Sequence, residues 1–142
     1  ISAAGYRHYE ISNGARPGHE SRHNLAYWRR LSHEAVGPGA HAFDGAARRW
    51  NDAAFEPWLA ALGRGDLPPG GREAIDSHVA ETERLILGLR LDDGLPAVDV
   101  MERHQPAIEW GIGEGLLQRA EGRLRLTARG RLLGNEVFAR LL

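Results

Sequence analysis

Two residue types are missing from this sequence: none of its 142 residues is cysteine, and none of its 18 basic residues is lysine. Because the chain has no thiol, it can form no disulfide, no thiolate metal site and no cysteine-ligated iron–sulfur cluster of its own. We attribute the exclusive use of arginine to genome composition. No apolar run approaches the roughly 20 residues that a membrane-spanning helix needs, and no signal peptide is recognisable. We therefore expect a soluble, cytoplasmic protein without a transmembrane segment.

Charge and apolar content narrow the class of protein further. The formal net charge of −1 gives no general attraction to nucleic acid or to an anionic membrane. Apolar residues make up 42% of the chain, which is enough for a real core. The first residues, ISAAGYRHYEIS, lack a methionine and are typical of the start of a buried strand. Because a strand needs neighbours, we expect the chain to be the rear part of a longer protein.

A Gly- and Pro-rich stretch, GRGDLPPGGRE at residues 63–73, has the composition of a linker. It suggests one domain over residues 1–68 and a second over 69–142. In the first, the pattern predicts a strand over Tyr6–Ile11, a helix over Glu20–Arg30, a short strand at Ala35–Val36 and a helix over Phe55–Leu62. The last of these places Phe55, Leu59 and Leu62 on one face. These elements are typical of a piece of α/β architecture that cannot close a sheet alone.

The second half has a clearer periodicity. A helical stripe is formed by Ile75, Val79, Thr82, Ile86 and Leu89. Further helices are expected over 97–104, 107–117 and 128–142, the last with Leu133, Val137 and Leu141 on one face. Between them, LQRAEGRLRLT predicts a hairpin that turns at Glu121-Gly122. Three helices, a hairpin and a closing helix predict an α+β fold with a winged-helix-like C-terminal domain.

The segment HESRH has the spacing of the zinc-protease signature H-E-x-x-H. His19, Glu20 and His23 would place two imidazoles on one helix face, with the Glu as general base. However, Pro17-Gly18 directly precedes His19, so the first histidine falls at or before the helix start, and no third ligand stands at the usual positions. We favour two polar histidines near a helix start, with a zinc peptidase as an alternative.

A winged-helix unit also raises the possibility of DNA binding. The predicted wing carries a group of basic residues suited to phosphate contacts: Arg119, Arg123, Arg125, Arg129 and Arg131. The candidate recognition helix, AIEWGIGEGLLQ, instead contains Glu109 and Glu114 and no residue suited to reading bases. An acidic helix has the wrong sign for a polyanion, so we favour a solvated arginine wing and keep a DNA-binding module as a second alternative.

Several motifs in order resemble one known family. They are YEISNGARPGHESRHNLAYWR, VGPGAHAF and RRWN in the first half, then ERLILGLRLDDGL and GLLQRAEGRLRLTARGRLLGNEVFARLL. The whole chain thereby resembles the oxygen-independent coproporphyrinogen III oxidase group of radical SAM proteins, and most closely its haem-chaperone branch. The resemblance makes the H-E-x-x-H spacing a coincidence. It leaves oxidase and chaperone activity as alternatives for the parent protein.

The resemblance implies the end of a partial (β/α) radical SAM barrel followed by a helical C-terminal domain. It also implies a [4Fe–4S] cluster and S-adenosylmethionine in the parent, and porphyrin or haem as a partner together with a haem-receiving protein. The family's C-x-x-x-C-x-x-C cluster motif is absent from this cysteine-free chain. We therefore expect the chain alone to be catalytically inactive, and we assign it no catalytic residue and no metal ligand.

The resemblance also assigns individual residues. Glu10, with Ser12 and Asn13, would end a strand at the barrel mouth, where Glu10 would contact haem or substrate. A cofactor-binding role is implied for Asn24, Leu25, Ala26, Gly37, Gly39 and Ala40. His23 and Trp28 would contact haem, since a neutral imidazole ligates iron and an indole packs on a porphyrin face. One departure stands out: the family has WRGGDYLGIGPGAHS where this chain has WRRLSHEAVGPGAHAF.

Taken alone, GPGAH at residues 37–41 predicts either a backbone nest for an anion or a simple tight turn.

Overall fold

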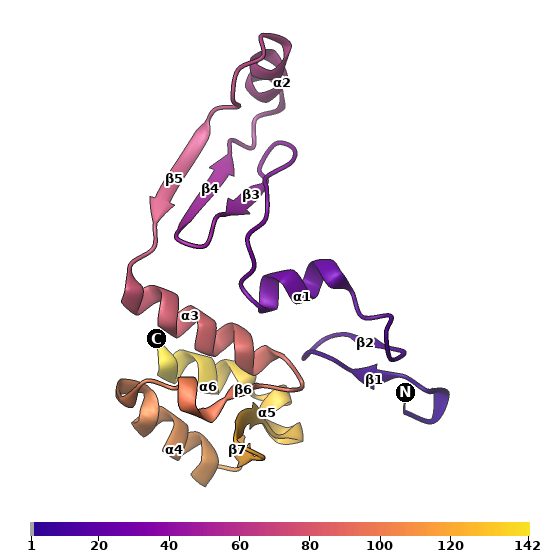
Figure 1. Cartoon of the computed structure of the whole chain (residues 1–142), viewed down its shortest axis with the longest axis vertical. Helices are drawn as coiled ribbons and strands as arrows, with labels where there is room; N and C mark the ends of the chain where they lie inside the picture. The colour runs from indigo at the N-terminus through magenta and orange to yellow at the C-terminus, as the bar shows by residue number, and fades with distance from the viewer. Residues whose placement is uncertain (1) are drawn as a thin grey trace. The chain divides into compact units, whose positions relative to one another are not determined.

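The computed structural model in Figure 1 describes residues 2–142. Their contacts divide the chain into two compact units, which are described separately. Unit 1 contains the residues up to Arg29 together with Ala80–Leu142, and unit 2 is Arg30–Val79. The units thus interleave in sequence and do not divide at the expected linker, so the domain limits 1–68 and 69–142 stay a prediction. Ile1, the first residue of the segment expected to lead into a buried strand, lies outside the described residues.

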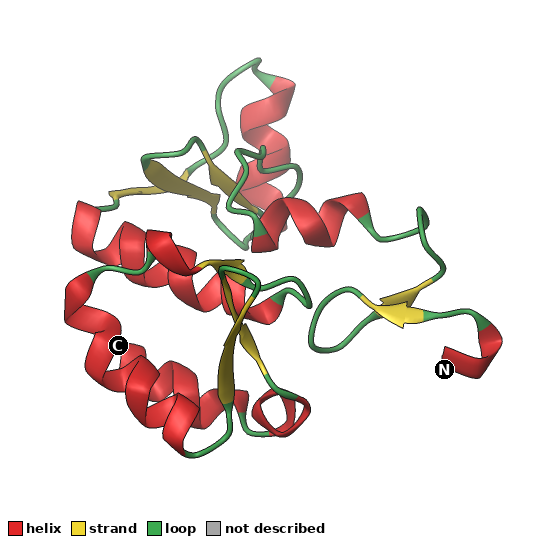
Figure 2. Ribbon diagram, turned by 60° about the horizontal axis from the view of Figure 1, so that its bottom comes forward, coloured by secondary structure: helices red, strands yellow, loops and turns green. Residues whose placement is uncertain are grey.

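The C-terminal part of unit 1 combines helices with a three-stranded antiparallel sheet (Figure 2). The helices are α3 (Ser77–Arg90, which starts in unit 2), α4 (Gln105–Gly113), α5 (Ala128–Leu132) and α6 (Gly134–Leu141). The strands follow the order β6 (Leu95–Pro96), β8 (Arg123–Leu126), β7 (Leu117–Ala120), and two 3-10 turns are at Ala97–Asp99 and Glu102–His104. The mixed helix and strand composition is confirmed, whereas the winged-helix description stays a prediction.

The helical stripe at the start of this region is confirmed, with a shifted beginning. Helix α3 starts at Ser77, where Asp76 Oδ1 accepts a hydrogen bond from the Val79 amide at 2.9 Å. Ile75 lies outside the helix. Its amide donates to Ala46 O at 2.9 Å and so continues the pairing of residues 70–74 with residues 47–51. Thr82 and Leu89 are buried, as the periodicity predicts, whereas Val79 is exposed and Ile86 is half-buried.

The predicted hairpin is β7–β8, and it turns at the expected dipeptide. Glu121 and Gly122 both have positive φ, 53° and 73°, as a type I′ turn requires. Leu124 and Leu126 on β8 are buried, while Arg123 and Arg125, which alternate with them, are half-buried. Both leucines belong to a core of ten buried residues: Leu85, Leu89, Leu95, Ile108, Leu116, Leu117, Leu124, Leu126, Val137 and Leu141.

The predicted helix over 97–104 is wrong, because these residues form two 3-10 turns. Two other predicted helices of this half have wrong boundaries. Helix α4 ends at Gly113, and Leu117 lies in β7. The single closing helix is interrupted at Leu133 (φ −114°, ψ 25°), which separates α5 from α6. Val137 and Leu141 are buried as expected, but Leu133 is 41% exposed because the break removes it from their face.

The N-terminal part of unit 1 is irregular. After a 3-10 turn at Ser2–Ala4, β1 (Arg7–His8) pairs only with β2 (Gly14–Ala15) among the described residues. The prediction of a buried strand over Tyr6–Ile11 is wrong here, because both β1 residues are exposed in a two-stranded hairpin. A turn follows in which the His19 amide donates to Arg16 O at 2.9 Å, with Gly18 at φ 83°. Helix α1 (Arg22–Trp28) then begins where Ser21 Oγ accepts from the Asn24 amide.

Unit 2 is a three-stranded antiparallel sheet with one helix. The strands, in sheet order, are β3 (His41–Phe43), β4 (Ala47–Asn51) and β5 (Gly70–Ala74), and the helix is α2 (Phe55–Gly63). Ala35–Val36, predicted as a short strand, is a loop apart from the neighbouring His33–Phe43 bridge.

The linker prediction for residues 63–73 is wrong at its end, because 70–74 form β5. The glycines of β5 allow β4 to pack closely against it: a Cβ on Gly71 would lie 2.3 Å from the Trp50 indole, and one on Gly70 would lie 1.8 Å from Trp50 O.

No helix in residues 2–142 is long and apolar enough to cross a membrane.

Candidate functional site

Helix α1 carries five of the residues that the sequence assigns to haem or cofactor. His23 is exposed, and its ring meets that of Tyr27 edge-on, with centroids 4.8 Å apart and an interplanar angle of 85°. The two lie four residues apart on one helix face. The neighbouring residues Asn24, Leu25 and Ala26 are half-buried. Helix α1 therefore offers an imidazole and a phenol ring to solvent.

Leu25 also lines a hollow of about 300 Å³ within unit 1. The hollow is enclosed by β1, the turn at Pro17, helix α1 and residues 91–93. Its walls carry His8, Glu20 and Asp92. It is a mixed polar cavity, and among the assigned cofactor residues it contains Leu25 alone.

Trp28 occupies the end of α1 and packs inside unit 1. The Arg90 guanidinium lies 4.4 Å from the centre of its ring, so one indole face is covered by a cation–π contact. Trp28 Nε1 is buried and has no hydrogen-bond partner among the described residues. A porphyrin cannot stack on the indole face that Arg90 covers. Trp28 could contact haem only through its other face or its edge. The haem-contacting role of Trp28 stays a prediction.

Glu10 is 1% exposed, the most buried charged residue of the described chain. Its Oε1 accepts hydrogen bonds from the Ser12 amide at 3.0 Å and from Asn13 Nδ2 at 2.6 Å, while Oε2 is buried without a partner. The backbone of Glu10 forms a bridge with Leu91. The carboxylate thus holds the E-I-S-N turn together, and its predicted contact with substrate would require this turn to open.

The remaining assigned residues, Gly37, Gly39 and Ala40, lie in the G-P-G-A-H loop of unit 2. Gly37 and Gly39 have φ of 102° and 68°, which L side chains rarely adopt. The Gly39 amide donates to Asp52 O at 3.0 Å and the Ala40 amide donates to Gly37 O at 3.4 Å. Because these donors are used within the protein, the loop forms a tight turn and not an open nest for an anion. The cofactor role of the three residues stays a prediction.

Asn51 fixes this loop, and the sequence analysis did not single it out. It is 4% exposed, its Nδ2 donates to Gly37 O at 2.9 Å and its amide donates to Ala40 O at 2.9 Å. The signal was present in the RRWN motif, whose last residue is this asparagine. The motif and the loop belong to one hydrogen-bonded structure.

The geometry of the H-E-x-x-H segment differs from that of a zinc protease. His19 lies in the turn before Ser21, which caps α1, so His19 and His23 do not share a helix face. Glu20 Oε1 accepts from the Gly18 amide at 3.2 Å. No cluster of three candidate metal ligands occurs among residues 2–142.

The five arginines of the predicted wing bind groups of the protein itself. Arg119 donates to Gln105 Oε1, Arg123 to the Asp93 and Gly94 carbonyls, Arg125 to Glu121, Arg129 to the Glu114 carbonyl and Arg131 to Asp92. These contacts tie β8 and α5 to neighbouring loops. They give the arginines a structural use, which the solvated-wing interpretation did not anticipate, and the DNA alternative stays an untested prediction.

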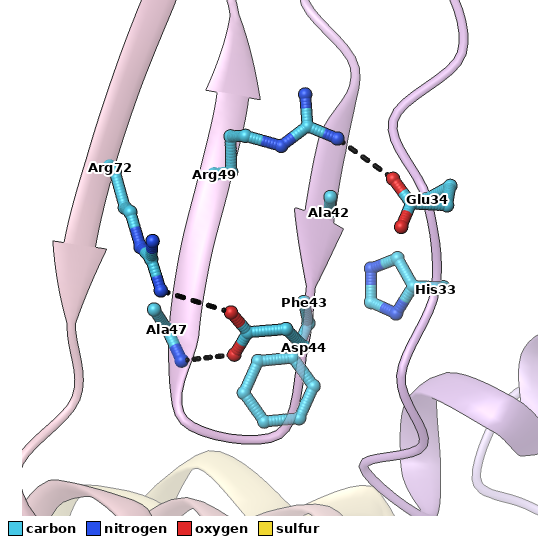
Figure 3. A pocket seen from close by; sticks show the side chains of 8 residues that line it. All are labelled: His33, Glu34, Ala42, Phe43, Asp44, Ala47, Arg49 and Arg72. Atoms are coloured by element: carbon cyan, nitrogen blue, oxygen red, sulfur yellow. Dashed lines mark hydrogen bonds and ion pairs between the residues drawn. The ribbon is translucent and has the colours of Figure 1, made fainter.

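A second hollow, of about 180 Å³, lies on one face of the unit 2 sheet (Figure 3). Arg49 pairs with Glu34 at 2.8 Å, and Arg72 pairs with Asp44 at 3.2 Å. Asp44 Oδ1 also accepts from the amides of Ala46 and Ala47, at 2.9 and 2.7 Å. These two backbone hydrogen bonds, with a smaller contribution from Arg72, hold the pKa of Asp44 below its ordinary value.

The HemN C-terminal domain family matches residues 75–133, which contain most of the buried apolar core of unit 1. The chain is 39% identical, over all of its 142 residues, to the heme chaperone HemW of Mycobacterium tuberculosis, of which it covers 36%. Residues 75–133 thus match the HemN C-terminal domain family, and the chain as a whole is similar to heme chaperones named HemW. The heme chaperone HemW of Bacillus subtilis is 31% identical over the whole chain, which covers 40% of it. The chain thus spans little more than a third of the length of these relatives.

A solved structure shares the fold. The radical SAM coproporphyrinogen III oxidase HemN of Escherichia coli superposes with a TM-score of 0.68 over 99% of this chain and 38% of that chain, at 16% identity. At this identity the likeness establishes the fold alone. This structure confirms the mixed α and β architecture. The predicted resemblance to the family is confirmed by the HemN domain match and the HemW relatives.

Proposed function

We propose that this chain is the haem-contacting and C-terminal portion of a haem chaperone, with His23 as the residue that meets haem. The observation that carries the proposal is the exposed His23 imidazole on α1, in a chain aligned over its full length with proteins named heme chaperone HemW. A neutral imidazole is a common axial ligand of haem iron. The adjacent Tyr27 ring adds an aromatic surface beside the same helix face.

The residues with a predicted cofactor role lie in two different parts of the chain. Asn24, Leu25 and Ala26 share α1 with His23, and Gly37, Gly39 and Ala40 belong to unit 2. We infer that the parent protein acts in the cytoplasm, carries S-adenosylmethionine and a [4Fe–4S] cluster, and passes haem to a receiving protein. This chain supplies no thiolate, so its residues do not fit the cluster, and no chemical step is assigned to it.

The test is a haem titration of the whole chain followed by absorption spectroscopy. Wild type should change the haem absorption band in a saturable way, and His23→Ala should lose most of that change because the iron loses its nitrogen ligand. His19→Ala is the matched control, since His19 is also exposed but lies in the turn before the helix. An unaltered titration of His23→Ala would remove the assignment, and equal losses in both variants would show a non-specific histidine effect.

A further inference from the structure

Unit 2 places two arginines directly opposite each other on neighbouring strands. Arg49 of β4 is the register partner of Arg72 of β5, so both side chains leave the same face of the sheet. Like charges in this position are destabilising. On the opposite face of the sheet, the neighbouring register pair has opposite charges. It consists of Arg48 and Glu73, which form an ion pair at 3.3 Å. Each arginine of the Arg49–Arg72 pair is balanced by a separate carboxylate, Arg49 by Glu34 and Arg72 by Asp44.

The same row contains a small residue that leaves room for a ligand. Ala42 of β3 is the register partner of Arg49, and it lines the hollow together with the two arginines. Figure 3 shows the Arg49 side chain extending across β3 to Glu34 and the Arg72 side chain extending to Asp44, with His33 beside Glu34. The hollow of about 180 Å³ is large enough for a phosphate or carboxylate group.

The two carboxylates that balance these arginines differ in how firmly they are held. Asp44 belongs to the β3–β4 turn, where two backbone amides fix its Oδ1. Glu34 comes from a loop, its side chain is 81% exposed, and it contacts Arg49 through Oε2 at 2.8 Å. An exposed ion pair of this kind is weak, so Glu34 is readily displaced by another anion.

We propose that this face of the β3–β4–β5 sheet binds the carboxylate or phosphate group of a ligand, which displaces Glu34 and is held by Arg49 and Arg72 together. Guanidinium groups present paired N–H donors that match the oxygens of both anion types. Glu34 occupies the place of the ligand's oxyanion until the ligand arrives. The site lies wholly in unit 2 and uses none of the residues assigned to haem, so it does not depend on the chaperone proposal.

The test is calorimetric titration of the whole chain with inorganic phosphate and, separately, with succinate, at constant ionic strength. Loss of a charged hydrogen-bonding partner should weaken binding about tenfold in Arg49→Gln and in Arg72→Gln. Glu34→Gln should bind the anion more tightly than wild type, because the internal competitor is gone. Arg48→Gln is the matched control: it carries the same change on the opposite face of the same strand and should bind as wild type does.

The outcomes separate the sources of the anion and can overturn the proposal. Arginine-dependent binding of phosphate alone identifies a phosphate ligand, and binding of succinate alone identifies a carboxylate ligand. Equal weakening in Arg48→Gln and Arg49→Gln would reveal a general charge effect and contradict the site. So would the failure of both anions to bind Glu34→Gln, a variant that should fold because the side chain is exposed.

Discussion

The C-terminal half of unit 1 and unit 2 are stabilised in different ways. Residues 80–142 enclose ten buried apolar side chains in one cluster. In unit 2 the buried apolar residues are mostly alanines, and the α2 side chains Phe55, Leu59 and Leu62 are about half exposed at 54%, 49% and 46%. The region that matches the HemN C-terminal domain therefore has a core of its own. Unit 2, which carries the arginine pair and the G-P-G-A-H loop, depends more on hydrogen bonds and sheet pairing.

The largest effect should come from opening a cavity in the core of unit 1. Leu124 is completely buried on the central strand β8, so Leu124→Ala should lower the free energy of unfolding by about 2–5 kcal/mol. The matched change in unit 2, Leu59→Ala, should alter it by less than about 1 kcal/mol because Leu59 is half exposed. Urea unfolding measures both. Similar losses in the two variants would contradict the difference between the units.

A second large effect should follow from a close approach of two backbones. A Cβ on Gly130 would lie 1.9 Å from Leu116 O, a backbone atom that cannot move away alone. Gly130→Ala should therefore destabilise unit 1 by about 1–3 kcal/mol or more. Gly113→Ala is the control, since its Cβ meets nothing within 4 Å at the end of α4. It should be neutral or slightly stabilising, as judged by thermal unfolding.

An intermediate effect is expected at the asparagine that holds the G-P-G-A-H loop. Asn51→Ala removes the side-chain amide that donates to Gly37 O, so this partly buried carbonyl loses its hydrogen bond. The free energy of unfolding should fall by about 1–2 kcal/mol. Because the loop is local to unit 2, amide hydrogen exchange should accelerate in β3 and β4 and stay unchanged in β8. Uniform acceleration in both units would show that they unfold together.

The smallest effect concerns the acid stability of unit 2. The backbone donors hold the pKa of Asp44 below its ordinary value of 3.8, so its stabilising contribution is complete above that pH and is lost as pH falls through the lowered pKa. Asp44→Asn should flatten the acid limb of unit 2 unfolding below about pH 4. In Arg72→Gln, the Asp44 carboxyl should still titrate below 3.8 by carbon NMR, because the backbone amides are the larger cause. A return to the ordinary value there would assign the shift to Arg72.

Sequence patterns predicted the C-terminal part best, because local signals and burial agree there. The stripe ending at Leu89 became α3, and Glu121-Gly122 became the hairpin turn with two positive φ angles. The break at Leu133 was not predictable from periodicity, since its apolar neighbours continue the pattern on both sides. Tertiary packing is close in this region, since a Cβ on Gly130 of α5 would lie 1.9 Å from Leu116 O.

Unit 2 was predicted poorly because its strands lack the usual signals. Gly70 and Gly71 indicated a linker, but they allow Trp50 to lie on β5. Arg48 and Arg49 are unusual residues for a strand, and their roles become visible only from the register with Glu73 and Arg72. Of the candidate site, the exposed position of His23 on a helix was predictable, whereas the Arg90 contact that covers Trp28 connects residues 62 positions apart (90 − 28) and required the fold.

The haem-ligand assignment can be tested most directly by resonance Raman spectroscopy of the ferrous haem complex. If the His23 imidazole binds the iron, wild type should show an iron–histidine stretching band, and His23→Ala should lack it while His19→Ala retains it. The same band in His23→Ala, or its absence from wild type under saturating haem, would contradict the assignment of helix α1 as the haem-contacting element.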